Sequence, residues 1–400
     1  MTVAAPYVDD YEPFRLSMLI RDKRYRAYTI QVFTMIAVML VVAWLVNNVI
    51  QNFEALGKTF SFSFLWQPAS YDINQRLIEY TSRSPHWVAA IVGILNTLVI
   101  AVLGCILATV LGVAIGVARL SKNWLLARMM TVYIEGFRNV PVLLWILLVS
   151  TVLSTALASP RQAPVLLGGN LVPTNRGTYI ASPVFEAGSG ILFGIFVLSL
   201  LAIWAFRRWA AARQQATGEI LPVFRVSLAL FFIPTLVAFF ALGQPVSLNY
   251  PELKGFNFQG GLYIRNSFIA LWLALSLYTA AFIAENVRAG IQAISKGQTE
   301  AAFALGLPPN RTMNLVILPQ ALRIIIPPLI SQYLNLTKNS SLAIAVGYMD
   351  VTGTLGGITL NQTGREMECL LLLMAFYLIV SLLISAAMNV YNASVALKER

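Results

Sequence analysis

Few side chains in this 400-residue chain are of the types that carry out catalysis or bind metals. The chain has one histidine, His86, and its two cysteines, Cys105 and Cys369, are far apart and form no CxxC pair. This pattern argues against a histidine-based catalytic centre, a zinc site or a redox site. No GxxxxGK[ST], HExxH or GxSxG motif is present, so the sequence gives no support for ATP hydrolysis or for an intramembrane hydrolase.

The segment 295–310 has a pattern of residues that is unusual for a connecting loop. Ser295 and Gln298 have the spacing of a capping box, and the stretch from Glu300 to Leu305 favours a helix. Gly306 suits a left-handed helix stop, and the prolines at 308–309 prevent continuation. The pattern predicts a short helix and a sharp turn. Its alanine face could fit closely into a groove of another protein, or the alanines could reflect helix propensity in an ordinary loop.

The amino-acid composition indicates the class of protein to which these residues belong. Apolar residues make up 58% of the chain and charged residues 11%, whereas a soluble protein carries roughly 25% charged residues. We therefore expect an all-α, polytopic membrane protein. The net charge of +11 then indicates basic loops on the cytoplasmic side of a bilayer rather than nucleic-acid binding.

Eight segments are apolar and long enough, or nearly so, to cross a bilayer, which takes roughly 20 residues. They lie at about 28–50, 88–118, 138–158, 189–206, 224–243, 263–285, 324–347 and 369–394. The segment 189–206 is the weakest, because it is short and is followed at once by Arg207 and Arg208. Most of the 28 Lys and Arg residues fall on the side that holds both termini and the loop 295–310. The positive-inside rule assigns that side to the cytoplasm.

Lys338 is the one charge that this assignment places deep in a span, about 22 Å along a helix from Arg323. Intramembrane charges normally face a cavity or a partner. Asn339, Ser340 and Ser341 are poor interior helix formers, so the helix could break there and expose an N-terminus that holds a carboxylate. The alternative is a lysine that extends to the membrane surface.

Three further features each have two interpretations. Glu285 and Arg288 are spaced to form a local ion pair at the end of a span, or they could belong to an inner gate. Gly112 and Gly116 permit close helix packing, either within the chain or between subunits. The segment 119–138 reads as an amphipathic helix that lies on the membrane surface or contributes to an interface with another subunit.

Several motifs, in the right order, resemble the polar-amino-acid branch of the ABC-importer permeases. Glu300-Ala-Ala-x-Ala-Leu-Gly306, followed by Ile317-Leu-Pro-Gln-Ala-Leu-Arg323, is similar to the EAA loop of that family. The stretches Ala284–Gln298, Tyr133–Pro141 and Leu336–Leu342 resemble the same branch, as does Asn96-Thr-Leu. The resemblance covers roughly 90–158 and 263–395, and the enlarged layout resembles the larger permease subunits of broad-specificity L-amino-acid importers.

The resemblance implies roles for named residues. The EAA loop would be the coupling helix that docks on an ATP-binding subunit, through Glu300, Ala301, Ala302, Ala304, Leu305 and Gly306. The substrate pathway would include Lys338, Asn339, Ser340, Ser341 and Leu342. This chain would bind no cofactor itself, because ATP and Mg would be bound by the partner ATPase.

The resemblance also implies a layout and partners. We expect a five-helix core made of 88–158 and 263–400, preceded by an extra helix and loop in 1–87 and interrupted by loops and two extra helices in 159–262. Partners would be a second permease in a heterodimer, a cytoplasmic ATPase dimer and a periplasmic amino-acid-binding protein, in a bacterial inner membrane. An ion-coupled secondary amino-acid transporter is the alternative, but it would need membrane carboxylates, and only Glu285 is close to that description. A channel or scaffold would need no coupling helix.

Overall fold

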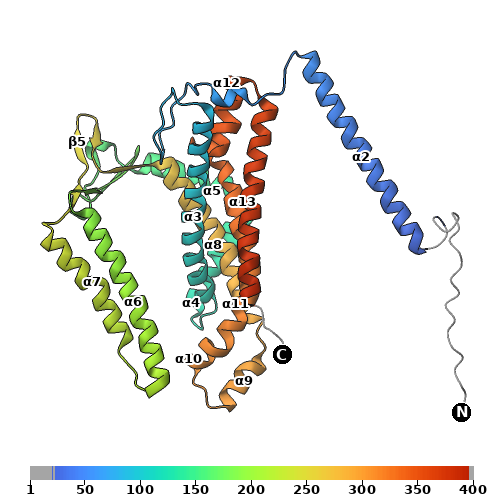
Figure 1. Ribbon diagram of the computed structural model, residues 1–400. Helices are drawn as coiled ribbons and strands as arrows, with labels where there is room; N and C mark the ends of the chain where they lie inside the picture. Colours follow the sequence, from blue (N-terminus) through green and yellow to red (C-terminus); the bar gives the residue numbers. More distant parts are fainter. Residues whose placement is uncertain (1–19, 21–22, 396–400) are drawn as a thin grey trace, which may run out of the picture. The chain divides into compact units, whose positions relative to one another are not determined.

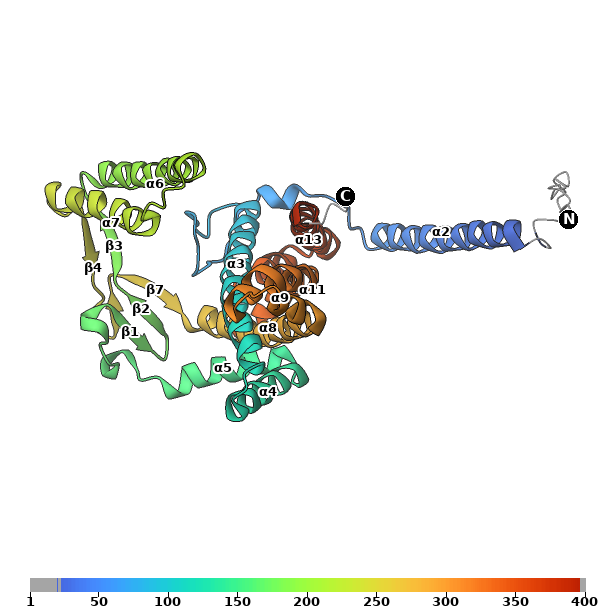
Figure 2. The ribbon, with the colours of Figure 1, turned by 90° about the horizontal axis from the view of Figure 1, so that it is seen from below.

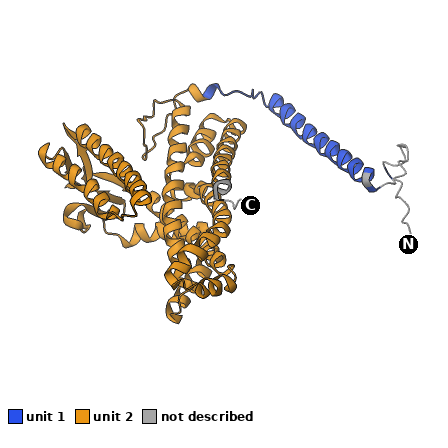
Figure 3. Cartoon of the chain, turned by 60° about the horizontal axis from the view of Figure 1, so that its bottom comes forward, with its two compact units in different colours: residues 1–64 blue, residues 65–400 orange. Residues whose placement is uncertain are grey.

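The computed structural model describes residue 20 and residues 23–395. The chain divides into two compact units, Met1–Phe64 and Leu65–Arg400 (Figure 3). The cytoplasmic segment expected at the N-terminus lies mostly outside the described residues. In the first unit, helix α2 covers Lys23–Ala55. Apolar side chains such as Phe33, Met39 and Leu40 are exposed all round α2. A helix that is apolar on every side suits hydrocarbon, in agreement with the expected first span.

The second unit is built on the packing of α3 (His86–Arg119) along α8 (Asn266–Gln292), visible in Figures 1 and 2. Gly112 and Gly116 make this close approach possible. A Cβ added at Gly116 would lie 2.7 Å from the carbonyl oxygen of Ala284, and one added at Gly112 would lie 2.6 Å from Ile283. Of the two interpretations of this glycine pair, the structure confirms packing within the chain.

The chain bends by 107° between helix α4 (Trp124–Asn139) and helix α5 (Val142–Ala156). Asn123 caps α4 by accepting hydrogen bonds from the N–H groups of Leu125 and Leu126. Pro141 forces Val140 into an extended conformation (φ −108°, ψ 133°), because a residue before proline avoids the helical region. The expected span at 138–158 is therefore wrong at its start, since Arg138 belongs to α4 and α5 begins only at Val142.

After α8 the chain forms the short helices α9 (Lys296–Ala304) and α10 (Pro309–Thr312), and a π-helical turn, Met313–Ile317, leads into α11 (Leu318–Asn339). A 3₁₀ turn at Ser340–Val346 extends α11. A π-helical segment at Thr352–Thr359 and α12 (Leu360–Thr363) then connect to α13 (Glu366–Val395). Helix α11 packs on both α13 and α3, completing the bundle.

The insertion between α5 and α8 contains a helical hairpin, α6 (Ser189–Thr217) and α7 (Val223–Ala241), whose helices pack on each other. The weak span 189–206 is thus part of a longer helix that continues through Arg207 and Arg208. Arg208 lies over the ring of Trp204, 5.0 Å from its centroid. Stacking of this kind lets the helix carry its charges beyond the apolar stretch.

Seven short strands form what we call the sheet module, together with the 3₁₀ turns Pro160–Gln162 and Leu167–Gly169. The strands are β1 (Leu171–Thr174), β2 (Gly177–Ile180), β3 (Ser182–Phe185), β4 (Val246–Asn249), β5 (Glu252–Lys254), β6 (Asn257–Gln259) and β7 (Leu262–Arg265). They pair antiparallel in the orders β1-β2-β7, β3-β4 and β5-β6. Leu171 lies opposite Ile180, and Gly177 lies opposite Arg265.

The described residues include seven helices that could span a membrane by length and composition, or eight if the bent pair α4–α5 counts as one span. This confirms a mainly helical, polytopic protein with about eight spans. The strands were not expected, because each has only three or four residues and some pair across the whole α6–α7 hairpin. The four-part division of the chain at residues 87, 158 and 262 stays a prediction.

Candidate functional site

Helix α9 presents the segment that resembles a coupling helix. Glu300, Ala301, Ala304 and Leu305 are exposed, and Leu305 is 82% exposed. Ala302 faces inward and is buried. Gly306 has a φ of +75°, the left-handed conformation expected at the end of this helix. The helix therefore offers a small, mostly alanine surface with an acidic residue, and no residue that the structure describes covers it.

The predicted capping box at the start of α9 is wrong in its side-chain bonds. Ser295 occupies the N-cap position but makes no side-chain cap hydrogen bond. The side-chain oxygen of Gln298 instead accepts a hydrogen bond from Nε2 of Gln320 on α11, at 3.2 Å. The amide pair links α9 to the start of α11, so a long-range contact replaces the local cap.

Glu285 and Arg288 form the local ion pair that their spacing predicts. Arg288 Nε lies 3.1 Å from Glu285 Oε2 and 3.2 Å from Oε1. Arg119, the last residue of α3, also donates to Glu285. One carboxylate thus joins two arginines and two helices at the end of the bundle nearest to α9. A role of this cluster in an inner gate stays a prediction.

A polar stripe runs along one exposed face of α11. We give this name to Ser331, Asn335 and Lys338, which are spaced by four and three residues and are all exposed. They lie within the apolar stretch Pro309–Val346 that could span the membrane. Polar side chains that face outward from a spanning helix indicate a partner protein or a water-filled cavity, because lipid cannot satisfy them.

The helix break expected at Asn339–Ser341 is not present. The chain tightens into a 3₁₀ turn, and the N–H of Ser340 bonds to the carbonyls of Leu336 and Lys338. The hydroxyls of Ser340 and Ser341 donate to the carbonyls of Thr337 and Lys338, at 2.7 and 2.8 Å. Because the local carbonyls satisfy these groups, no free helix N-terminus is available here for a carboxylate. Asn339 and Leu342 are half-buried, and Leu342 packs against the core.

The segment after this turn is tied to α3 by residues whose roles the sequence analysis did not assign. The side-chain amide of Asn96 donates to the carbonyls of Gln75 and Met349, each at 2.8 Å. Thr97 accepts from the N–H of Val351 at 3.0 Å, and the Tyr348 hydroxyl donates to the carbonyl of Asn96 at 3.0 Å. The segment that follows Lys338 is therefore fixed against the helix that carries Asn96-Thr97.

Asp350 is the principal buried acid that the sequence analysis missed. It is fully buried, and its Oδ1 accepts a hydrogen bond from the N–H of Gly353 at 2.8 Å, as an N-capping residue does. Burial raises the pKa of this carboxyl to about 6. The signal in the sequence was an aspartate three residues before Gly353, at the start of a helical segment. Asp350 therefore has a structural role at the foot of the segment Thr352–Thr359.

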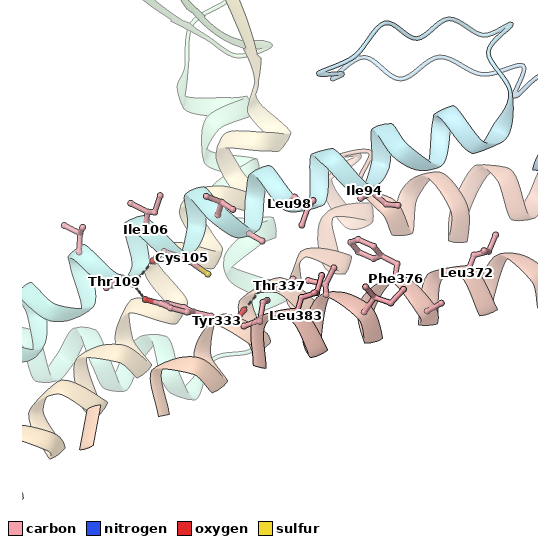
Figure 4. A pocket seen from close by; sticks show the side chains of 17 residues that line it. Ile94, Leu98, Cys105, Ile106, Thr109, Tyr333, Thr337, Leu372, Phe376 and Leu383 are labelled. Atoms are coloured by element: carbon pink, nitrogen blue, oxygen red, sulfur yellow. Dashed lines mark hydrogen bonds between the residues drawn. The ribbon is translucent and has the colours of Figure 1, made fainter. Parts of the chain in front are cut away.

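A cavity of about 1060 Å³ lies between α3, α11 and α13 (Figure 4). Its lining is almost entirely apolar, with residues such as Leu98, Ile106, Phe376 and Leu383, and it contains no charged side chain. Thr109 and Tyr333 point toward one another in Figure 4, and their oxygens lie 2.7 Å apart. An amino acid carries two charges that need partners, so this cavity does not suit it.

Comparison with known proteins identifies the family. A family model described as "Binding-protein-dependent transport system inner membrane component" matches residues 220–396. The glutamate/glutamine/aspartate/asparagine transport system permease protein BztB of Rhodobacter capsulatus is 53% identical, over 97% of each chain. The chain belongs to the amino-acid ABC transporter permeases.

Two further permeases of this family align over nearly the whole chain. The general L-amino acid transport system permease protein AapQ of Rhizobium johnstonii is 44% identical, over 97% of this chain and 96% of its own. The putative amino-acid ABC transporter permease protein YhdX of Escherichia coli is 43% identical, over 96% and 98%. The permease is thus a multi-pass subunit of an inner-membrane ABC importer for amino acids, and not an ion-coupled transporter. This family works with an ATPase and a binding protein.

Proposed function

We propose that this permease forms one wall of a pathway through which an ATP-driven importer passes several chemically different L-amino acids from the periplasm to the cytoplasm. The observation that carries the proposal is the polar stripe on α11, Ser331, Asn335 and Lys338, exposed within a spanning segment. An outward-facing lysine with two hydrogen-bonding neighbours provides a site for the α-carboxylate that all amino acids share.

The second wall would come from a different permease. A homodimer that used this face about a two-fold axis would bring the same stripe of each copy together. Two copies of Lys338 would then face one another in a medium of low dielectric constant, where like charges repel strongly. A heterodimer avoids this repulsion and could supply an acceptor for the substrate's α-amino group.

The coupling step would use the exposed face of α9. Glu300, Ala301, Ala304 and Leu305 would dock in a groove of the cytoplasmic ATPase, with Ala302 and Gly306 setting the position and end of the helix. ATP and Mg would be bound and consumed by that ATPase. The Gln298–Gln320 hydrogen bond would pass movement of α9 to α11, the helix that carries the polar stripe. This assignment places α9 and both termini in the cytoplasm.

The proposed broad specificity rests on the lack of an available carboxylate close to Lys338 in the sequence. The stretch Leu336–Gly347 contains no carboxylate, and the nearby Asp350 is fully buried and caps a helical segment. A site dedicated to cationic amino acids would need an acid to meet the side chain. Two of the relatives have names that specify four acidic and amide amino acids or general L-amino acids, which supports a site that recognises the shared α-carboxylate.

Substrate-stimulated ATPase activity of the complex, reconstituted with its binding protein in proteoliposomes, tests the proposal. We expect Lys338→Met to reduce stimulation by all substrates about tenfold or more, whereas Lys338→Arg keeps the cation and most of the activity. Equal kinetics of Lys338→Met and the wild type for every substrate would assign the lysine to the membrane surface. Stimulation by cationic amino acids alone would contradict broad specificity.

A further inference from the structure

The sheet module carries three consecutive apolar residues on its surface, which we call the apolar turn: Val165, Leu166 and Leu167. All three are exposed, and Leu167 is 74% exposed. The sheet module has its own small core of Val172, Tyr179 and Phe258, and the apolar turn does not contribute to that core. Exposed, contiguous apolar side chains on an aqueous surface commonly mark a protein contact.

The backbone holds the apolar turn in a fixed shape. Leu167 has a φ of +52°, which is uncommon for a residue with a branched apolar side chain, and Gly168 and Gly169 also have positive φ values. Leu166 and Leu171 exchange backbone hydrogen bonds of 2.8 and 3.2 Å, and the side chain of Asn170 donates to the carbonyl of Leu167. Strain that is retained at an exposed tip and fixed by this many bonds is typical of a preformed binding surface.

The sheet module is suited to an aqueous surrounding rather than to the hydrocarbon core of a bilayer. The hairpin β5-β6 leaves strand edges unpaired, and open edges do not occur facing lipid. Its surface carries exposed charges such as Arg161, Glu252 and Lys254. Strand β7 leads directly into α8, a helix of 27 residues that is about 40 Å long, and α9 follows its other end. The sheet module and α9 therefore lie at opposite ends of the bundle (Figure 1).

We infer that the apolar turn is a docking point for the soluble binding protein. This inference rests on the proposed function, because it needs α9 in the cytoplasm and hence the sheet module in the periplasm. In Figure 2 the strands lie on the side of α3 and α8 away from α11, the helix that carries the polar stripe, and from α13. The soluble partner that must bind and leave at the periplasmic surface is the binding protein, and a small, rigid apolar patch suits a reversible contact.

The variant Leu167→Asn removes the apolar side chain while the backbone conformation of the turn is retained. Asparagine adopts positive φ more readily than leucine, so the turn should fold at least as well while it loses its most exposed apolar group. Leu167→Met retains apolar surface. Leu253→Asn makes the same polar change at an exposed residue of β5 and is the matched control.

The measurement is the ATPase rate of the full complex in nanodiscs, titrated with the binding protein of the same system loaded with L-glutamine. We expect Leu167→Asn to raise the concentration for half-maximal stimulation about fivefold or more, with the basal rate unchanged. Leu167→Met and Leu253→Asn should stay within about twofold of the wild type.

Three outcomes would overturn the inference, and they can be told apart. An unchanged half-maximal concentration in Leu167→Asn would show that the apolar turn does not dock the binding protein. An environment-sensitive dye on Val165→Cys that reports an apolar surrounding before any binding protein is added would assign the turn to the membrane. A wild-type complex that no concentration of binding protein stimulates would refute the proposed function itself.

Discussion

Arg119, at the end of α3, donates a hydrogen bond to the carboxylate of Glu285 on α8. The same carboxylate accepts from Arg288, one turn further along α8, so it holds α3 and α8 together at the end of α8 that leads to α9. The three side chains are each less than one-third exposed. Breaking a charged contact at this depth leaves partners unsatisfied and costs more than losing a surface ion pair.

Glu285→Gln should therefore lower the melting temperature of the detergent-solubilised complex by several degrees, because two arginines lose their shared carboxylate. The matched control is Glu135→Gln, at an exposed residue whose carboxylate accepts a hydrogen bond from the side-chain amide of Asn139 at 3.3 Å. If the cluster also acts as a gate, Glu285→Gln should raise ATP hydrolysis in the absence of substrate. Equal melting temperatures of the two variants would mean that the cluster contributes little to stability.

Gly306→Val should uncouple transport, since a β-branched residue resists the φ of +75° at the end of α9. The strain is about 1–2 kcal/mol, enough to disturb a short exposed helix. Gly306→Asn should retain most of the activity because asparagine tolerates this conformation. Glu300→Lys should weaken ATPase binding because it reverses the charge of the exposed acid on α9. Co-purification of the ATPase and transport by each variant are the measurements, and wild-type values for both Val and Lys variants would make the segment an ordinary connector.

Two glycine pairs with the same spacing should respond differently to alanine. Gly116→Ala places a Cβ 2.7 Å from the carbonyl oxygen of Ala284 and should destabilise the protein by about 1–3 kcal/mol. Gly190→Ala and Gly194→Ala, on α6, meet no atom within 4 Å of the new Cβ and should be neutral or slightly stabilising. Thermal unfolding in detergent measures the difference. A neutral Gly116→Ala would show that α3 and α8 can separate without loss.

Stability should fall as the pH rises through 6, because of Asp350. Burial raises its pKa from 3.8 to about 6, so the folded protein holds this proton more tightly than the unfolded chain does. The stabilising contribution is complete below about pH 4 and is lost as the pH passes the folded value. The wild type should melt at a higher temperature at pH 5 than at pH 7.5, and Asp350→Asn should reduce this difference. Glu252→Gln, at an exposed acid, should leave the pH dependence unchanged.

Impermeant thiol labelling in intact cells tests the orientation, in a background where Cys105 and Cys369 are replaced. Cysteines at Asn74 and Lys254 should react from outside, because both residues are exposed on the side proposed as periplasmic. Cysteines at Gln215 and Gln298 should react only after the membrane is permeabilised. Labelling of residue 298 in intact cells would reverse the orientation and remove α9 from the reach of a cytoplasmic ATPase.

The sequence predicted features that depend on local chemistry and on composition. The apolar segments indicated the spans, and Gly306 and Gly112-x-x-x-Gly116 indicated a helix stop and a close packing that the structure confirms. Features that depend on distant partners were not predictable. Gln298 bonds to Gln320 rather than to its own helix end, and Ser340 uses the carbonyls before it rather than opening the helix. Strand β2 pairs with β7, which follows the whole α6–α7 hairpin in the sequence. No short-range sequence pattern could therefore predict this pairing.

The insertion between α5 and α8 leaves the bundle and returns to it at neighbouring points. The side chain of Asn266, the first residue of α8, donates to the carbonyl of Thr174 in β1 at 3.0 Å, and α5 packs along α8. A segment whose two ends meet can be exchanged without moving the elements on either side of it. The α6–α7 hairpin and its strands could thus be transplanted between permeases as a cassette, which would let evolution, or a protein engineer, alter what the outer surface recognises while the transport core stays intact.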